Sequence, residues 1–385
     1  MNSVALGTLI YFLGIDAICG LKVCPYLRKN SSGITNRPVL IPGFEKCGTT
    51  ELFHILNSTG CFKTGKKKEL KFLNRFCVSE RTRVKKKLRS THYRHCPNVT
   101  KCSQLSDYLH CWPNDPVAPP LDGTPAYSHT ILLHQNKLVS AATELQYLTS
   151  SSSSIWLLRN PVERTISSYY FFRVRNHYVK CTLERKVQQE IEFLQGNRFL
   201  TQLFLKPPEE ITPKNMTLAW ARLRRNFREF GYKKYSKYCP ATPEIIIGSF
   251  YLPMLVHWVS SLKGARHMFL CSESFFSDPE YIAAEYIEPF VFQSKKIPNF
   301  KQIENNIISF KPDLSNKGKY NRDEGNEIKC ILQCFFAPFT ANLFKWLIFL
   351  QTYGNVEVYP SISEFGWSSA RICNCNFSAH SQWSE

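Results

Sequence analysis

Two short segments of this chain carry residue types that bind phosphate groups, and the first is Gly43–Thr50 (GFEKCGTT). Its glycines let backbone N–H groups approach an anion closely, and Lys46 adds a full positive charge. The apolar run Pro38–Ile41 precedes the segment, and a helical pattern from about Thr49 to Leu56 follows it, so we expect a strand, a loop and a helix. The loop's two threonines can cap that helix and donate hydroxyl hydrogen bonds. This layout suits phosphate binding, although an ordinary glycine-containing turn would show the same short pattern.

The position of the lysine distinguishes this loop from the P-loop of a nucleotide kinase. A kinase loop places Lys directly after the second glycine, followed by a Ser or Thr that binds Mg²⁺. Here Thr49 follows Gly48, and Lys46 lies inside the loop. We therefore expect a loop that holds phosphates without a metal, which favours sulfuryl over phosphoryl transfer because the sulfuryl group carries less charge. A P-loop nucleotide kinase stays an alternative, and it predicts Mg²⁺ dependence and ATP binding.

The second segment is Leu158–Tyr170 (LRNPVERTISSYY), which follows the apolar strand candidate Ile155–Leu158. It places Arg159 at the end of the strand and Ser167 eight residues further on, in a predicted helix. An arginine forks onto phosphate oxygens, and a serine hydroxyl can complete the binding shell. The alternative without a binding role is a surface arginine and a serine near the start of a helix.

Taken together, the two segments resemble the nucleotide-binding motifs of the PAPS-dependent sulfotransferases, PAPS being 3′-phosphoadenosine 5′-phosphosulfate. The first resembles their 5′-phosphosulfate loop and the second their 3′-phosphate motif. The resemblance implies PAPS as donor, no metal requirement, and a P-loop-type central parallel sheet flanked by helices, the α/β sulfotransferase fold. Residues 317–320 resemble the loop that closes over the nucleotide. The donor-binding residues implied are Lys46, Cys47, Gly48, Thr49, Thr50, Arg159, Ser167, Lys317, Gly318, Lys319 and Tyr320.

Weaker matches extend the resemblance from about residue 38 to residue 367. Asp122–Tyr127 (DGTPAY) resembles a segment near the family's substrate cleft, and Ile247–Leu252 with Trp258 resembles a later G-x-Y…W segment. Cys334–Leu343 resembles an aromatic helix close to the end of the fold. Each match is weak alone, and it is their order along the chain that supports the family.

A lysine–glutamate pair, Lys68-Glu69, points to the acceptor. Here the chain most resembles N-acetylgalactosamine 4-sulfate 6-O-sulfotransferase, and next the heparan sulfate sulfotransferases. The resemblance implies transfer to chondroitin or dermatan sulfate, at the 6-hydroxyl of N-acetylgalactosamine. Relatives read K-E-P-[HQ]-[FW]-[FW] at this point, whereas residues 68–73 read KELKFL. The missing proline and the missing second aromatic residue put the loop geometry and the acceptor preference in doubt.

The resemblance assigns catalysis to Glu69 and Lys46. Glu69 would take the proton of the acceptor hydroxyl as the bond to sulfur forms, and Lys46 would stabilise the leaving oxygen. Glu69 could instead be a charge partner for neighbouring lysines. His54 is the other candidate base, but we expect it to be packed on an apolar helix. We assign acceptor contacts to Lys68 and Arg75, within the basic stretch Lys63–Arg89.

The whole chain has 385 residues and a formal net charge of +19. Its hydrophobic content of 43% and charged content of 21% are ordinary for a folded protein, so global disorder is excluded. The charge indicates a polyanionic partner, and composition alone leaves nucleic acid, anionic lipid and acidic polysaccharide open. The resemblance implies a sulfated polysaccharide. No aromatic–basic nucleic-acid module is recognisable, so nucleic acid is not expected. A catalytically inactive, glycan-binding relative is the non-enzyme alternative.

We expect one α/β sulfotransferase domain over residues 38–370, preceded by a candidate signal-anchor and linker (1–37) and followed by a tail (371–385). Residues 4–23 are mostly apolar, but Asp16 interrupts them and no basic flank precedes them. Five Asn-x-Ser/Thr sequons and 15 cysteines favour the Golgi lumen, as a type II membrane protein or a secreted form. The spacing of the cysteines does not fit a zinc site. The disulfide candidates are Cys96, Cys102, Cys111, Cys330, Cys334, Cys373 and Cys375.

Overall fold

The computed structural model describes the greater part of the expected domain. The described residues are 37–65, 67–73, 105–112, 118–134, 137–149, 151–174, 181–234, 239, 244–293, 326–352, 355–359, 365 and 367. The predicted site residues Arg75, Lys317, Gly318, Lys319 and Tyr320 lie outside them, as do residues 1–36 and 371–385. The predictions made for those residues stay predictions.

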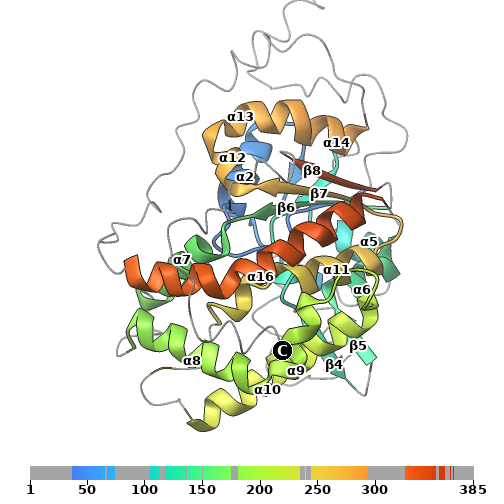
Figure 1. The fold of residues 1–385 in the computed structure, drawn as a ribbon. Coiled ribbons are helices and arrows are strands. Elements are labelled where there is room, and N and C mark those ends of the chain that lie inside the picture. The colour runs from blue at the N-terminus through green and yellow to red at the C-terminus, as the bar shows by residue number, and fades with distance from the viewer. Residues whose placement is uncertain are drawn as a thin grey trace, which may run out of the picture.

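The core of the fold is a parallel sheet (Figure 1). Its strand order is β2-β3-β1-β6-β7-β8, and every neighbouring pair is parallel. The strands are β1 (Val39–Leu40), β2 (Lys63–Thr64), β3 (Pro120–Asp122), β6 (Ser153–Leu158), β7 (Arg266–Cys271) and β8 (Val356–Tyr359). A separate antiparallel hairpin joins β4 (Ile131–His134) to β5 (Lys137–Ser140). The predicted α/β class with a central parallel sheet is confirmed by this order.

Helices cover both faces of the sheet. All six residues of β6 are buried, as expected for a central strand with helices on either side. Figure 1 shows α2, α12, α13 and α14 on one side of the sheet and α7, α11 and α16 on the other. The helices are α2 (Thr49–Ser58), α5 (Leu105–Leu109), α6 (Ala141–Leu148), α7 (Pro161–Val174), α8 (Leu183–Gly196), α9 (Arg198–Gln202), α10 (Pro213–Lys234), α11 (Tyr251–Ser261), α12 (Ser272–Ser277), α13 (Pro279–Ile282), α14 (Glu288–Phe292) and α16 (Asn326–Gln351).

The strand order reverses between β1 and β6, and we expect a ligand crevice at the ends of these two strands. After β1 the chain leaves through α2 towards β2 on one side of the sheet, whereas after β6 it leaves through α7 towards β7 on the other side. Ligands of open α/β sheets bind at such a reversal, beyond the carboxyl ends of the strands. Both phosphate-binding segments predicted from the sequence follow these two strands.

Two segments differ from what their local sequence suggests. The apolar run Ile245–Ile247 suggests a strand, but it leads into the 3₁₀ turn Ile247–Ser249. The carboxylate of Glu190 accepts the N–H groups of all three isoleucines, so a neighbouring strand cannot accept them. The stretch Cys96–Tyr127, rich in Pro, Asp, Asn and Cys, suggests a loop, but it contains β3 and the 3₁₀ turn Pro125–Tyr127. A strand of three residues that begins with proline is too short to show an apolar period.

Helix α16 is long and apolar enough to cross a membrane by length and composition. In this fold it lies along the sheet domain, where Trp346 and Leu347 are fully buried, and it contacts α7, α11 and β8. These contacts are those of a core helix. Pro338 lies in the interior of α16.

Candidate active site

The segment Gly43–Thr50 forms a loop between β1 and α2, as predicted. Lys46 and Gly48 have φ angles of 70° and 94°. Left-handed residues that alternate with right-handed ones turn successive N–H groups towards one side, which makes a concave site for anions. The first N–H groups of α2 have no acceptor within the helix and add to this site.

Gly48 is the N-terminal cap of α2, and no side chain caps the helix. The prediction that Thr49 and Thr50 cap it is therefore wrong, because they are its first two residues. The positive φ of 94° at Gly48 favours glycine, and a side chain here would also displace the Phe276 ring. A Cβ at this position would lie 2.4 Å from Cζ of Phe276, whose ring covers the start of the helix. The hydroxyls of Thr49 and Thr50 face Lys68 instead, as described below.

The structure brings the loop and Arg159 together. Arg159 follows β6, and its Nη1 donates a hydrogen bond to the carbonyl oxygen of Lys46 (3.0 Å). Asn160 then caps α7 by accepting the N–H of Val162 (3.0 Å), with Pro161 in the first turn. This strand–cap–helix sequence places the arginine at the mouth of the crevice. Ser167 is half-buried on α7, and its contact with a 3′-phosphate stays a prediction.

Lys46 is half-buried beside the crevice. Its Nζ lies 4.1 Å from the centroid of the Phe171 ring, on α7. The ring face attracts the ammonium group and restricts its position. The loop lysine is thus held close to the helix that carries the second motif.

Cys47 anchors the loop to the core of the protein. Its side chain is fully buried, with Sγ 3.6 Å from the hydroxyl of Tyr251, and this hydroxyl donates to the carbonyl oxygen of Arg159 (2.8 Å). The Cys47 carbonyl accepts a hydrogen bond from the hydroxyl of Ser272 (2.7 Å). Burial raises the pKa of the Cys47 thiol and keeps it neutral. Because its backbone N–H donates to the Phe44 carbonyl, we assign Cys47 to loop support rather than to direct nucleotide binding.

Lys68 and Glu69 lie next to the loop, but they have different partners. Lys68 Nζ donates to the hydroxyls of Thr49 (3.2 Å) and Thr50 (2.9 Å). Glu69 pairs with Lys71 at 3.0 Å, and about a third of each side chain is exposed. The charge-partner interpretation of Glu69 therefore has direct support, while its role as a base stays a prediction.

A buried carboxylate holds the segment that carries these residues. Asp122 is fully buried and accepts three hydroxyl hydrogen bonds, from Tyr108 (2.7 Å), Thr124 (2.6 Å) and Tyr127 (2.7 Å). Thr124 and Tyr127 accept in turn the backbone N–H groups of Lys71 (3.2 Å) and Leu73 (3.3 Å). Burial raises the pKa of Asp122, and the three hydroxyls oppose that rise. The segment Asp122–Tyr127 thus fixes residues 68–73 beside the crevice.

Arg164, which the sequence analysis missed, anchors the loop from the core. Only 2% of its surface is exposed, and its Nε donates to the Glu45 carbonyl (3.1 Å). Its Nη1 donates to the hydroxyl of Ser249 (2.9 Å) and the carbonyl of Ile245 (3.2 Å). A signal was present, because Arg164 lies within the second motif, but its three distant partners cannot be found from a linear pattern.

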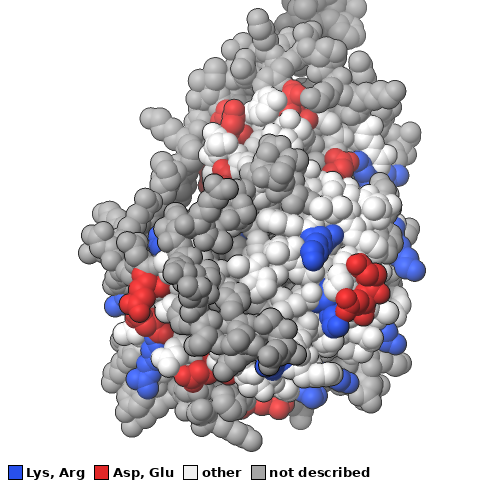
Figure 2. Space-filling view, in the orientation of Figure 1, with Lys and Arg blue, Asp and Glu red and all other residues white. Residues whose placement is uncertain are grey.

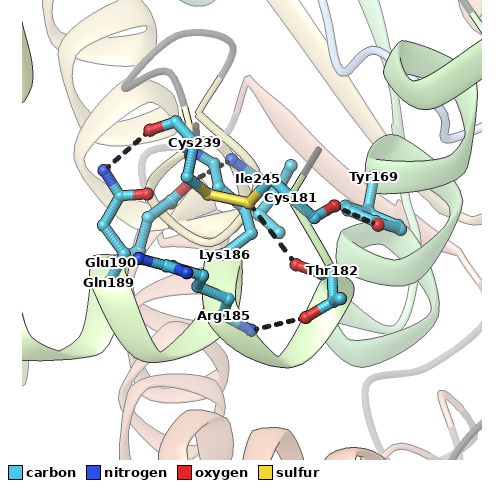
Figure 3. The surroundings of a disulfide bond; sticks show 9 residues. All are labelled: Tyr169, Cys181, Thr182, Arg185, Lys186, Gln189, Glu190, Cys239 and Ile245. Atoms are coloured by element: carbon cyan, nitrogen blue, oxygen red, sulfur yellow. Dashed lines mark hydrogen bonds and ion pairs between the residues drawn. A yellow bond between two sulfur atoms is a disulfide. The ribbon is translucent and has the colours of Figure 1, made fainter. Parts of the chain in front are cut away.

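The segment that holds Arg164 is itself fixed by a buried pair and a disulfide (Figure 3). Glu190 pairs with Lys186 at 3.2 Å with both side chains fully buried, and it accepts the N–H groups of residues 245–247. A disulfide joins Cys181 to Cys239, whose carbonyl accepts a hydrogen bond from Gln189 (3.3 Å). This disulfide was not predicted. Among the predicted disulfide candidates, those that the structure shows bonded are Cys111, Cys330 and Cys334.

The other candidate base, His54, is exposed on α2. The expectation that it is packed is therefore wrong. The buried face of this helix is formed by Leu52, Phe53, Ile55 and Leu56, and residue 54 points to the other side. Within the described residues, no group of three His, Cys, Asp or Glu side chains is suited to a metal ion.

The surface charge is mixed where it can be described. Figure 2 shows small groups of Lys and Arg next to small groups of Asp and Glu on this face. The described part of this face therefore has no broad patch of one sign. Of the predicted basic stretch Lys63–Arg89, the structure describes only residues 63–65 and 67–73.

Comparison with known proteins adds little to this geometry. No family model matches the chain. No curated protein sequence matches it either. Among solved structures, it is similar to the sulfotransferase from Alicyclobacillus acidocaldarius, with a TM-score of 0.42 and 15% identity over 83% of this chain and 99% of that chain. The fold class stated above therefore rests on the strand order, and the site on its own contacts.

Proposed function

We propose that this protein is a PAPS-dependent sulfotransferase that acts on a carbohydrate hydroxyl. One observation carries the proposal: the Arg159 guanidinium donates to the backbone of the Lys46 loop, at the ends of two adjacent parallel strands. Two candidate phosphate-binding groups thus lie side by side. A nucleotide with phosphates at both its 3′ and 5′ positions needs such a pair of sites, and PAPS is such a nucleotide.

The proposed reaction is an in-line displacement at sulfur. The oxygen of the acceptor hydroxyl bonds to sulfur while the bond from sulfur to the 5′-phosphate oxygen breaks, and that oxygen gains negative charge. Lys46 and the N–H groups at the start of α2 stabilise this charge as it develops. Glu69 takes the hydroxyl proton, for which it must leave its pair with Lys71.

For the acceptor we propose a sulfated glycosaminoglycan, with chondroitin or dermatan sulfate as the first candidate. The net charge of +19 favours a polyanion, and the Lys68-Glu69 pair resembles the acceptor segment of enzymes that act on such chains. We propose the Golgi lumen as the compartment, because disulfides persist in the oxidising secretory pathway and Cys181–Cys239 is one. A type II membrane anchor within residues 4–23 belongs to the same proposal.

An inactive glycan-binding relative is the second candidate function. The Glu69–Lys71 ion pair favours it, since a carboxylate held by a lysine is not placed as a base. The two candidates differ in turnover but share nucleotide and glycan binding.

An acceptor screen separates the two candidates. The purified protein is incubated with radiolabelled PAPS and chondroitin, dermatan, heparan or keratan chains in the presence of a chelator, and disaccharide analysis locates the label. The enzyme proposal predicts label on one class of chain and at least a tenfold loss of rate for Glu69→Gln, since a positioned base contributes about 10²–10⁴-fold. Binding of adenosine 3′,5′-bisphosphate (PAP) without transfer to any chain would instead favour the inactive relative.

A further inference from the structure

Lys68 reaches from its own segment to the phosphate-binding loop. Its Nζ lies within hydrogen-bond distance of two hydroxyls, on Thr49 and Thr50, in the first turn of α2. Both hydroxyls accept from the ammonium group, which leaves their own protons to donate to an anion. The sequence pattern assigned Lys68 to the acceptor, but these contacts are on the side of the nucleotide loop.

Gly123 leaves room for the side chain of Lys68. A Cβ at residue 123 would lie 2.9 Å from Cγ and 3.2 Å from Cε of Lys68, and 2.7 Å from Cδ2 of Phe53. The N–H of Gly123 also donates to the Lys68 carbonyl (3.0 Å). The lysine stem therefore runs directly over a residue without a side chain, and its path depends on that glycine.

The environment of Lys68 makes its charge responsive to an incoming anion. Desolvation lowers the pKa of Lys68 to about 8, and Lys71 acts in the same direction. The carboxylates of Glu69, Glu45 and Asp122 raise the pKa. An anion bound next to the ammonium group would favour its charged form further.

We propose that Lys68 is a second donor-site cation, which binds the 5′ end of the nucleotide together with Lys46 and stabilises the leaving oxygen. This inference rests on the proposed sulfotransferase function and assigns Lys68 a place within it. The ammonium group and the two threonine hydroxyls form one cluster of donors at the N-terminus of α2. The sulfuryl group leaves from an oxygen that faces this cluster.

Two nucleotides test the assignment by calorimetry: PAP, and adenosine 3′-monophosphate, which lacks the 5′-phosphate. The unmodified protein is compared with Lys68→Met, Lys68→Arg and Gly123→Ala, and with Lys263→Met as an exposed control. We expect Lys68→Met to bind PAP at least tenfold more weakly while its affinity for the 3′-monophosphate changes less than twofold, a loss that fits one charged hydrogen-bonding group. Lys68→Arg restores most of the affinity, and Lys263→Met changes neither.

The Gly123→Ala variant tests the contact of Lys68 with Thr49 and Thr50 by displacing the lysine instead of replacing it. Gly123→Ala displaces the Lys68 stem, so we expect the same selective loss of PAP affinity. If this variant does not fold, as judged by circular dichroism, Lys68→Met alone decides. Above about pH 7, where the nucleotide phosphates are ionised, PAP affinity of the unmodified protein falls as the pH rises through about 8, whereas Lys68→Arg shows a flatter profile.

Three results would overturn the assignment. Equal losses for both nucleotides in Lys68→Met would mean a structural role. Unchanged PAP affinity with a raised KM for the polysaccharide would return Lys68 to the acceptor side, as the sequence pattern predicted. Unchanged PAP affinity and rate would exclude both roles. Failure of the unmodified protein to bind either nucleotide would instead contradict the proposed function itself.

Discussion

At the scale of single residues, two arginines of the candidate site are held by backbone carbonyls of the loop. Arg159 and Arg164 donate to two successive carbonyls of the loop, those of Lys46 and Glu45. A guanidinium has five N–H donors in a fixed plane, so Arg159 can hold the loop and still present donors to a phosphate. Arg164 is buried and joins the loop to the segment of residues 245–249. Two residues of the same type thus hold the loop, and one of them, Arg159, is also the predicted phosphate ligand.

A buried acid away from the crevice gives a prediction at this scale. Only 1% of Glu288 is exposed, and burial raises the pKa of its carboxyl from 4.5 to about 8, opposed by a hydrogen bond with Thr59. Below pH 4.5 the Glu288 carboxyl is protonated in both the native and the unfolded state. Between pH 4.5 and about 8 the unfolded chain releases this proton while the native state keeps it, so the free energy of unfolding falls as the pH rises.

Glu288→Gln keeps the shape of the side chain without its charge. We expect the variant to exceed the unmodified protein in free energy of unfolding by about 4–5 kcal/mol at about pH 8.5, and by less than about 1 kcal/mol near pH 5. Urea unfolding at the two pH values measures this difference. The same difference at both would mean that Glu288 does not titrate in this window.

At the scale of elements, the loop depends on a segment far away in the sequence. Residues 245–249 hold Arg164, and they are held in turn by Glu190 on α8 and by the disulfide between Cys181 and Cys239 (Figure 3). The carboxylate of Glu190 replaces the strand partners that these residues lack. The loop conformation is therefore coupled to how α8 docks.

Removal of the disulfide tests that coupling. The cysteines are 58 residues apart, and closing a loop of this length stabilises the native state by about 4 kcal/mol in the chain-entropy model. We expect the double variant Cys181→Ser/Cys239→Ser to lose 2–4 kcal/mol, roughly, of unfolding free energy, and also to bind PAP more weakly because the segment that holds Arg164 loosens.

The control for this prediction is Cys271→Ser, which alters a buried free thiol outside the segment. It should lose less stability than the double variant. Equal losses in the two variants would show that the effect comes from burying serine hydroxyls rather than from the missing cross-link.

At the scale of the whole molecule, the sequence predicts what is local. The strand–loop–helix around Lys46 and the strand–turn–helix around Arg159 follow from apolar runs and helical patterns that are adjacent in the chain, and both are confirmed, although the predicted threonine caps are not. The order of elements also predicts the parallel sheet, because strands that alternate with helices pair in that way. The crevice then follows from where the two strands end.

Contacts between distant segments could not be predicted in this way. The contact of Lys68 with two residues of α2 and the disulfide across 58 residues leave no periodic trace in the sequence. Strand β3 could not be predicted from the sequence because it is short and begins with Pro120. The isoleucines 245–247 suggest a strand because β-branched residues favour strands. Here the buried carboxylate of Glu190 accepts their N–H groups and sets their conformation instead.

The account depends on one nucleotide being held at both ends, by the Lys46 loop and by Arg159. Calorimetry with PAP and with adenosine 5′-monophosphate, in the presence of a chelator, tests this most directly, because the two differ only in the 3′-phosphate. We predict that the unmodified protein binds PAP at least tenfold more tightly, and that Arg159→Lys removes most of the difference, since lysine lacks the planar fork. Equal affinity for both nucleotides, or binding only of ATP with Mg²⁺, would contradict the account.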